Sequence, residues 1–239
     1  MVLLGALVNG AAIVFGSALG RLLRRIPEGM KTTVMNGIGL AIVVLGIQMA
    51  FKTENFLVVL ISLVAGGVLG EWWDVDKRFS QLGGWVERRL GAGEQGGIAQ
   101  GFITASLVFV VGAMAIIGAL DSGMKGNHQV LFTKAVMDGF IAVILTSTLG
   151  LGVLLSALPV FLYEGAIALF ATQINRFVPQ ALMDGMIAEM TAAGGILIAA
   201  IGLNLLGLTK IKVANLLPAI LAAVLLTALL FGLGLGYRS

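Results

Sequence analysis

The sequence predicts an all-α fold, a polytopic bundle of transmembrane helices with about eight spans (seven or eight). Hydrophobic residues make up 59% of the 239 residues, charged residues make up 11%, and the mean hydropathy is +1.04. Soluble domains contain about 25% charged residues. A soluble domain of this length could not bury so much apolar surface, so lipid must surround most of the chain.

Eight stretches are apolar enough to be spans, given that a helix needs about 20 such residues to cross the hydrocarbon core. The sixth is the shortest, and we expect it to begin within Leu154–Leu158, because Pro159 disfavours helix in the residue before it. The expected spans are Val2–Gly20, Thr33–Phe51, Phe56–Trp72, Gln100–Leu120, Val130–Leu151, Pro159–Ala171, Ile187–Leu208 and Val213–Tyr237.

A different kind of segment joins the third and fourth spans. From Asp76 to Leu90, hydrophobic residues recur at helical spacing and basic residues fall mostly on the other side. This pattern is typical of a helix that lies in the membrane interface. The residues assigned to this interfacial helix are Lys77, Arg78, Phe79, Trp85, Arg88 and Arg89.

The basic residues predict the orientation of the bundle. Of the 15 Lys and Arg residues, 10 fall in the connections that follow the first, third and seventh spans. The positive-inside rule places these connections in the cytoplasm and both termini outside.

The first three spans resemble the last three. Asn9 matches Glu164 at an offset of 155 residues, and Gln48 matches Asn204 at an offset of 156. Because the two units begin five spans apart, their topologies would be opposite, as in many secondary transporters. We interpret the chain as one transmembrane domain, 1–239, with repeat units at 1–72 and 156–239, an interfacial helix and linker at 73–98, and spans four and five at 99–155.

Polar side chains at membrane depth are costly unless they are paired or hydrated, so each is a candidate for a substrate or ion pathway. Lys134 and Asp138 lie one helical turn apart and are expected to pair, either within a substrate site or as a structural ion pair. Gln48 and Asn204 are interpreted either as ligands of a solute or as an interhelical hydrogen bond. The candidate pathway residues are Asn9, Asn36, Gln48, Lys134, Asp138, Glu164 and Asn204.

Other residues have structural interpretations. Small residues at helical spacing let helices approach closely, within the subunit or across a dimer. The residues predicted to pack helices in this way are Gly16, Gly20, Gly66, Gly70, Gly112 and Gly118. Trp72 and Trp73 are expected to anchor the interface. Asp184 and Glu189 are expected to be solvated at the outer end of the seventh span.

Composition argues against several functional classes. The chain has no Cys and a single His, so thiolate metal sites, thiol nucleophiles and a Ser-His arrangement are not expected. No phosphate-binding loop follows the Gly-rich stretches, and no basic run is dense enough for nucleic acid. We therefore expect no catalytic residues, no cofactor and no metal. The expected partners are the lipid bilayer, a small solute or ion, and a second copy of the chain.

Several segments resemble one bacterial membrane protein family. They are Val111–Gly118, Lys134–Gly139, Ser156–Val160, Gly194-Gly195, Gly202–Leu206 and Val213–Pro218. Together they resemble the YqgA/YdfK-like proteins, domain of unknown function 554, over nearly the whole chain. The resemblance implies a bacterial plasma membrane location and implies no activity. Tyr163-Glu164-Gly165 departs from the family pattern, which tends to have Gln at the central position.

Two functional hypotheses follow. The first is a small-solute or ion transporter, or a channel, with its site near the membrane midplane where the two repeats meet. The alternative is a non-transporting scaffold or sensor that binds partner helices through its glycine faces, or lipids through its interfacial helix.

Overall fold

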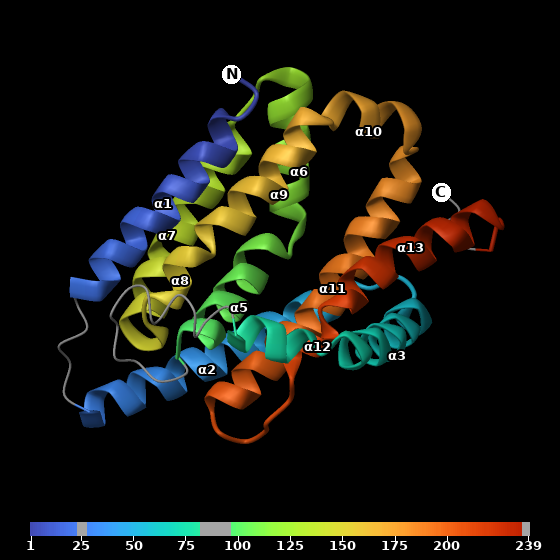
Figure 1. Ribbon diagram of the computed structural model, residues 1–239. Coiled ribbons are helices and arrows are strands. Elements are labelled where there is room, and N and C mark those ends of the chain that lie inside the picture. Colours follow the sequence, from blue (N-terminus) through green and yellow to red (C-terminus); the bar gives the residue numbers. More distant parts are fainter. Residues whose placement is uncertain (23–27, 82–96, 236–239) are drawn as a thin grey trace. The chain divides into compact units, whose positions relative to one another are not determined.

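The computed structural model describes residues 1–22, 28–81 and 97–235, and every regular element within these ranges is a helix (Figure 1). Seven helical stretches are long and apolar enough to cross a membrane, which confirms the predicted transmembrane helix bundle. They are α1 (Leu4–Leu22), α2 (Glu28–Ala50), α3 (Phe56–Trp73), α7 (Gln129–Leu149), α8 with α9 (Gly152–Leu155 and Ala157–Leu169), α11 (Gln180–Leu205), and α12 with α13 (Val213–Leu216 and Pro218–Gly232).

The remaining predicted span, Gln100–Leu120, is not one continuous helix. Instead, α5 (Gly97–Val110) and α6 (Ala113–Lys125) meet at a bend of 60°. Gly112 lies between them with a φ of 148°, a conformation that residues with a side chain rarely adopt. A Cβ on Gly112 would meet no atom within 4 Å, so this glycine permits the break and does not pack helices as predicted. The bundle has up to eight spans when the bent pair is counted as one.

The chain divides into two compact units. Unit 1 comprises Met1–Val34, Phe79–Val110 and Met114–Ile174, and unit 2 comprises Met35–Arg78, Val111–Ala113 and Asn175–Ser239. Each unit combines segments that are far apart in the sequence. Unit 1 pairs α1 from the first proposed repeat with α9 from the second, and unit 2 pairs α3 and the part of α2 from Met35 onward with α11, α12 and α13.

In unit 1, α1 lies against α7 along most of its length (Figure 1). Two glycines permit this approach. A Cβ on Gly16 would lie 2.2 Å from the carbonyl oxygen of Gly139, and a Cβ on Gly20 would lie 2.4 Å from that of Val143. Since no carbon atom fits at these distances, only glycine allows the two helices to be this close. α7 also contacts α6, where a Cβ on Gly118 would meet Leu131 at 2.9 Å.

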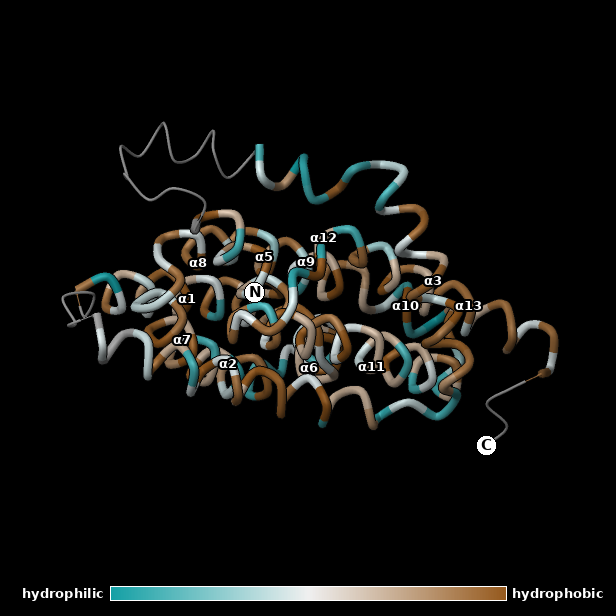
Figure 2. The backbone as a smooth tube through the Cα atoms, turned by 90° about the horizontal axis from the view of Figure 1, so that it is seen from below, coloured by the Kyte–Doolittle hydropathy of each residue, from teal (hydrophilic) through white to brown (hydrophobic). Residues whose placement is uncertain are grey.

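In unit 2, glycines on α3 have the same role. A Cβ on Gly66 would lie 2.2 Å from the backbone nitrogen of Ala219, and a Cβ on Gly70 would lie 1.8 Å from the carbonyl oxygen of Asn215. The backbone of α3 therefore touches that of α12 and α13. Figure 2 shows α3 and α13 drawn mostly in the hydrophobic colour. Their outer faces carry exposed apolar side chains, among them Val64 and Leu221, as expected for helices that face lipid.

Candidate functional site

Four polar side chains meet inside unit 1. Asn9 comes from α1, Lys134 and Asp138 come from α7, and Glu164 comes from α9. Each is at most 6% exposed, and Asn9 and Glu164 are completely buried. Residues four apart on a helix share a face, so the sequence of α7 places Lys134 directly beside Asp138. We refer to these four residues as the polar cluster.

Hydrogen bonds join the three helices through the polar cluster. The Asn9 amide nitrogen Nδ2 donates to Asp138 Oδ2 at 3.1 Å and to Glu164 Oε1 at 2.8 Å. Lys134 Nζ forms an ion pair with Asp138 Oδ2 and lies 3.4 Å from Glu164 Oε1. One amide and one ammonium group therefore hold both carboxylates together.

Two atoms of the polar cluster have no hydrogen-bond partner. They are Asn9 Oδ1 and Glu164 Oε2, and both are shielded from solvent. With all groups ionised, two carboxylates face one ammonium group, which leaves one negative charge uncompensated among apolar helices. Such a site favours an additional positive charge. Among the described residues, no three His, Cys, Asp or Glu side chains gather as metal ligands would.

The structure does not bring the other candidate residues into this cluster. Asn36 and Gln48 are exposed on α2. Asn204 closes the turn that follows α11: its Oδ1 accepts from Thr209 Oγ1 at 2.7 Å and from the Ile211 backbone nitrogen at 2.9 Å, and its Nδ2 donates to the Ile211 carbonyl oxygen at 2.8 Å. The side chain of Asn204 thus stabilises the connection to α12.

Glu189 was expected to be solvated, and this expectation is wrong. Its side chain is completely buried in α11. Its carboxylate accepts from Thr53 Oγ1 at 2.6 Å and from the backbone nitrogens of Glu54 and Asn55, each at 2.9 Å. These donors belong to the loop that leads into α3, so Glu189 fixes the entry to that helix. The partners are 134 to 136 residues away along the chain, so no local signal in the sequence could have indicated them.

A second polar contact at the other end of α3 was also missed. The Asn215 side chain donates to Glu71 Oε2 at 2.5 Å and accepts from the backbone nitrogen of Asp76 at 2.7 Å. Lys212 Nζ donates to Glu71 Oε1 at 3.0 Å, and this hydrogen bond raises the pKa of the Lys212 ammonium group. Asn215 is buried while Glu71 and Lys212 are exposed, and the contact fixes the connection from α3.

The interfacial helix is described only in its first part. Residues 75–81 are helical, and Lys77 and Arg78 are exposed. Phe79 is half-buried, and its ring centroid lies 5.8 Å from that of Phe102 on α5. Trp85, Arg88 and Arg89, the other residues assigned to this helix, lie outside the described residues.

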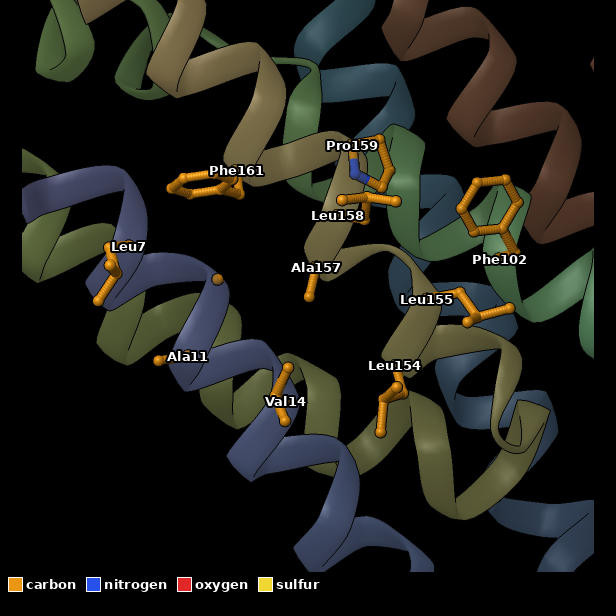
Figure 3. Close-up of a pocket in the computed structure, with 11 residues that line it drawn as sticks. Leu7, Ala11, Val14, Phe102, Leu154, Leu155, Ala157, Leu158, Pro159 and Phe161 are labelled. Carbon is orange, nitrogen blue, oxygen red and sulfur yellow. The ribbon is translucent and has the colours of Figure 1, made fainter. Parts of the chain in front are cut away.

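An apolar groove also lies in unit 1. Its volume is about 710 Å³. Figure 3 shows it between α1, which carries Leu7 and Val14, and α8 with α9, which carry Leu154 and Phe161. Every residue that lines the groove is apolar, so the groove suits hydrocarbon and offers no ligand to an ion.

Similarity to known proteins covers nearly the whole chain. The model of the DUF554 family, described as a protein of unknown function, matches residues 4–228. The chain belongs to the DUF554 family. Among its DUF554 relatives is the uncharacterized membrane protein YdfK of Bacillus subtilis (strain 168), 30% identical over 238 residues, which are 98% of this chain and 99% of YdfK. The uncharacterized protein YqgA of Escherichia coli (strain K12) is 28% identical over 232 residues, which are 94% of this chain and 96% of YqgA. No solved structure matches this DUF554 protein.

Proposed function

We propose that this DUF554 protein is a small-solute or ion transporter, or a channel, and that the polar cluster is its binding site. The observation that supports this function most strongly is the burial of Lys134, Asp138 and Glu164 together on membrane-spanning helices. Ionisable side chains at membrane depth are rare, and where they occur they commonly mark ion pathways or proton relays. An ion pair alone would explain Lys134 and Asp138, but it leaves Glu164 and its unpartnered oxygen unexplained.

The position of the cluster supports a site where two inverted repeats meet. Asn9 and Glu164 hold matching places in the proposed repeats, and they are hydrogen-bonded to each other. A residue and its symmetry equivalent contact one another only when they lie close to the symmetry axis. The hydrogen bond between these two side chains is therefore expected of a site on a pseudo-twofold axis.

Glycines of α2 and α11 give independent support for the repeat. At the offset of 156, Gly39 matches Gly195 and Gly46 matches Gly202. Each glycine of α2 approaches the match of the other one. A Cβ on Gly39 would lie 3.4 Å from the Gly202 carbonyl oxygen. A Cβ on Gly46 would lie 2.5 Å from the Gly195 carbonyl oxygen. Exchanging the two repeats converts one contact into the other, as a twofold relation requires.

The proposed setting is the bacterial plasma membrane, with both termini outside. The basic residues support this orientation, since Arg21 lies in the last turn of α1 and Lys210 and Lys212 follow α11. The break between α5 and α6 is a further feature of this class, because discontinuous helices recur in secondary transporters.

The experiment begins with thermal melts of the detergent-purified protein across a panel of ions and small solutes. A ligand that binds only the folded state adds about 2.7 kcal/mol of stability at a hundred times its Kd, which a melt detects. Flux of each stabilising ligand is then measured in proteoliposomes for the wild type, Asp138→Asn and Asp184→Asn. Asp184 is an exposed carboxylate bonded to Gln180, and it serves as the matched control. We expect Asp138→Asn alone to abolish flux. Unchanged flux in a folded Asp138→Asn protein would refute the proposed site.

The apolar groove favours a second candidate function. A membrane scaffold or sensor needs a surface for lipid tails or partner helices, and the groove between α1 and α9 offers one. Here the basic residues of the interfacial helix would attract anionic headgroups. Neutralising Lys77, Arg78, Arg88 and Arg89 should then abolish binding to anionic vesicles, whereas in a transporter these changes should leave flux intact.

A further inference from the structure

We infer that Glu164 carries a proton on Oε2, that this proton is donated in a hydrogen bond to Asn9 Oδ1, and that it is the ion to which the protein couples. The coupling role rests on the proposed function. The proton-binding site itself rests on the polar cluster alone and is tested without any flux.

Asn9 and Glu164 each have one buried oxygen without a hydrogen-bond donor. Asn9 Nδ2 donates to Glu164 Oε1 at 2.8 Å, while the amide oxygen Asn9 Oδ1 and the other carboxyl oxygen, Glu164 Oε2, have no partner. Both are acceptors when Glu164 is ionised, so neither can satisfy the other. An amide and a carboxylic acid are complementary: the amide N–H donates to the acid carbonyl, and the acid O–H donates to the amide carbonyl. Because Asn9 Nδ2 already donates to Glu164 Oε1, a proton on Oε2 that is donated to Asn9 Oδ1 would complete this pair of hydrogen bonds and satisfy both atoms.

The charges of the cluster favour the same protonation state. Asp138 Oδ2 accepts from Asn9 Nδ2 and forms an ion pair with Lys134 Nζ, so Asp138 is the carboxylate that the lysine neutralises. Glu164 lies farther from the ammonium group, at 3.4 Å. With a proton on Glu164, the cluster is neutral overall. Without it, one net negative charge stays buried among membrane-spanning helices.

Among the described residues, the helices around Glu164 place no other charge where it could replace this proton. Lys134 and Asp138 of α7 are the ionisable groups that contact Glu164 from another helix. The helices α5 and α8 contain no ionisable residue, and the only one on α1 is Arg21 in its last turn. On α6, Asp121 and Lys125 pair with each other at 2.8 Å. Tyr163 is the neighbour of Glu164 on α9, and it is a neutral phenol.

Release of the proton is a simple acid dissociation. The Oε2–H bond breaks, its electron pair stays on the carboxylate, and the proton passes to water. Asn9 Oδ1 then loses its donor, and the cluster gains a negative charge. Both changes weaken the contact between α1 and α9, so the site would differ in stability before and after proton release. A difference of this kind is what couples proton binding to movement of a solute.

Infrared spectroscopy tests the proton directly on the purified full-length protein. A protonated carboxylic acid has a C=O band that a carboxylate lacks. We expect this band at neutral pH in the wild type and in the control Asp184→Asn, and its loss in Glu164→Gln. Gln is the matched replacement, because its Nε2 donates to Asn9 Oδ1 in place of the acid O–H and its Oε1 still accepts from Asn9. An unchanged band in a folded Glu164→Gln protein would overturn the inference.

Flux measurements separate this inference from the proposed function. The probe is a ligand selected by the melts, measured with and without an imposed pH gradient. We expect the pH gradient to change the rate of flux through the wild type and to leave the rate through Glu164→Gln unchanged. If Glu164→Gln loses the band but no variant or wild type shows flux, the proton site stands and the transporter proposal fails. If flux occurs and its response to the gradient is the same in Glu164→Gln, transport stands and coupling through Glu164 is refuted.

Discussion

Gly46 of α2 and Gly195 of α11 meet at backbone distance. A Cβ on Gly46 would lie 2.5 Å from the carbonyl oxygen of Gly195, and a Cβ on Gly195 would lie 2.7 Å from that of Gly46. The same Cβ on Gly46 would lie 2.3 Å from the backbone nitrogen of Ala199. Backbone atoms cannot rotate away as a side chain can, so a single methyl group must push the helices apart.

Gly46→Ala should therefore destabilise the protein by about 1–3 kcal/mol, the usual cost of inserting atoms into a well-packed contact. Gly37→Ala is the matched control on the same helix, because a Cβ there meets nothing within 4 Å. The control should be neutral or slightly stabilising, since Ala favours helix over Gly. Thermal melts in detergent compare the two. Equal melting temperatures for both variants would show that α2 and α11 are not in backbone contact.

Lys134→Met should cost about 3–5 kcal/mol, because it leaves Asp138 as an unpaired charge in the interior. Adding Asp138→Asn removes that charge and should restore most of the lost stability. The measurement is the melting temperature of the wild type, both single variants and the double variant. Additive losses in the double variant would mean that the two side chains do not interact.

Glu189→Ala should loosen the entry to α3. The substitution removes the acceptor of Thr53 Oγ1 and of the Glu54 and Asn55 backbone nitrogens. A buried donor left unpaired costs about 1–3 kcal/mol. Asp184→Ala on the same helix is the control, since Asp184 is exposed. Hydrogen exchange at the amides of residues 54 and 55 should accelerate in Glu189→Ala and stay unchanged in Asp184→Ala.

Single cysteines test the orientation without background, because the chain contains no Cys. A membrane-impermeant thiol reagent should label Lys52→Cys and Asn127→Cys in intact cells. Lys210→Cys should react only after permeabilisation. All three positions are exposed in the structure. If position 52 reacts in intact cells and position 127 does not, the α5–α6 pair returns to the side it came from and is not a span.

The spans could be predicted because hydrocarbon thickness sets their length, and that requirement acts on each stretch of sequence by itself. The pairing of Lys134 with Asp138 could be predicted for the same reason, since both lie on one helix. The break at Gly112 depends on a backbone angle that glycine permits but does not require. Glu189 and Asn204 depend on partners that only the folded chain supplies: a distant loop for Glu189, and the particular path of the turn for Asn204.

The sequence predicted that Asn9 and Glu164 hold matching places in two repeats, and the structure shows that their side chains are hydrogen-bonded to each other. Similar surroundings at an offset of 155 residues indicated that they hold matching places. Nothing in the sequence indicated that the two side chains touch each other, or that both also contact α7. Matching residues of two repeats meet only if they lie near the axis, and the position of an axis is a property of the folded chain.

The spacing of charges along α7 also matters while the protein is being made. Synthesis runs from the N-terminus, so Lys134 and Asp138 reach the bilayer before Glu164 does. A lone charge at the centre of a helix opposes insertion by about 2.5–3.5 kcal/mol. Because the two residues lie four apart, they neutralise each other as soon as α7 is helical, with no help from a later segment. When Glu164 enters the membrane, Lys134 is already paired with Asp138, so Glu164 can enter as a neutral acid. These three residues can thus be inserted in order without an unbalanced charge among them.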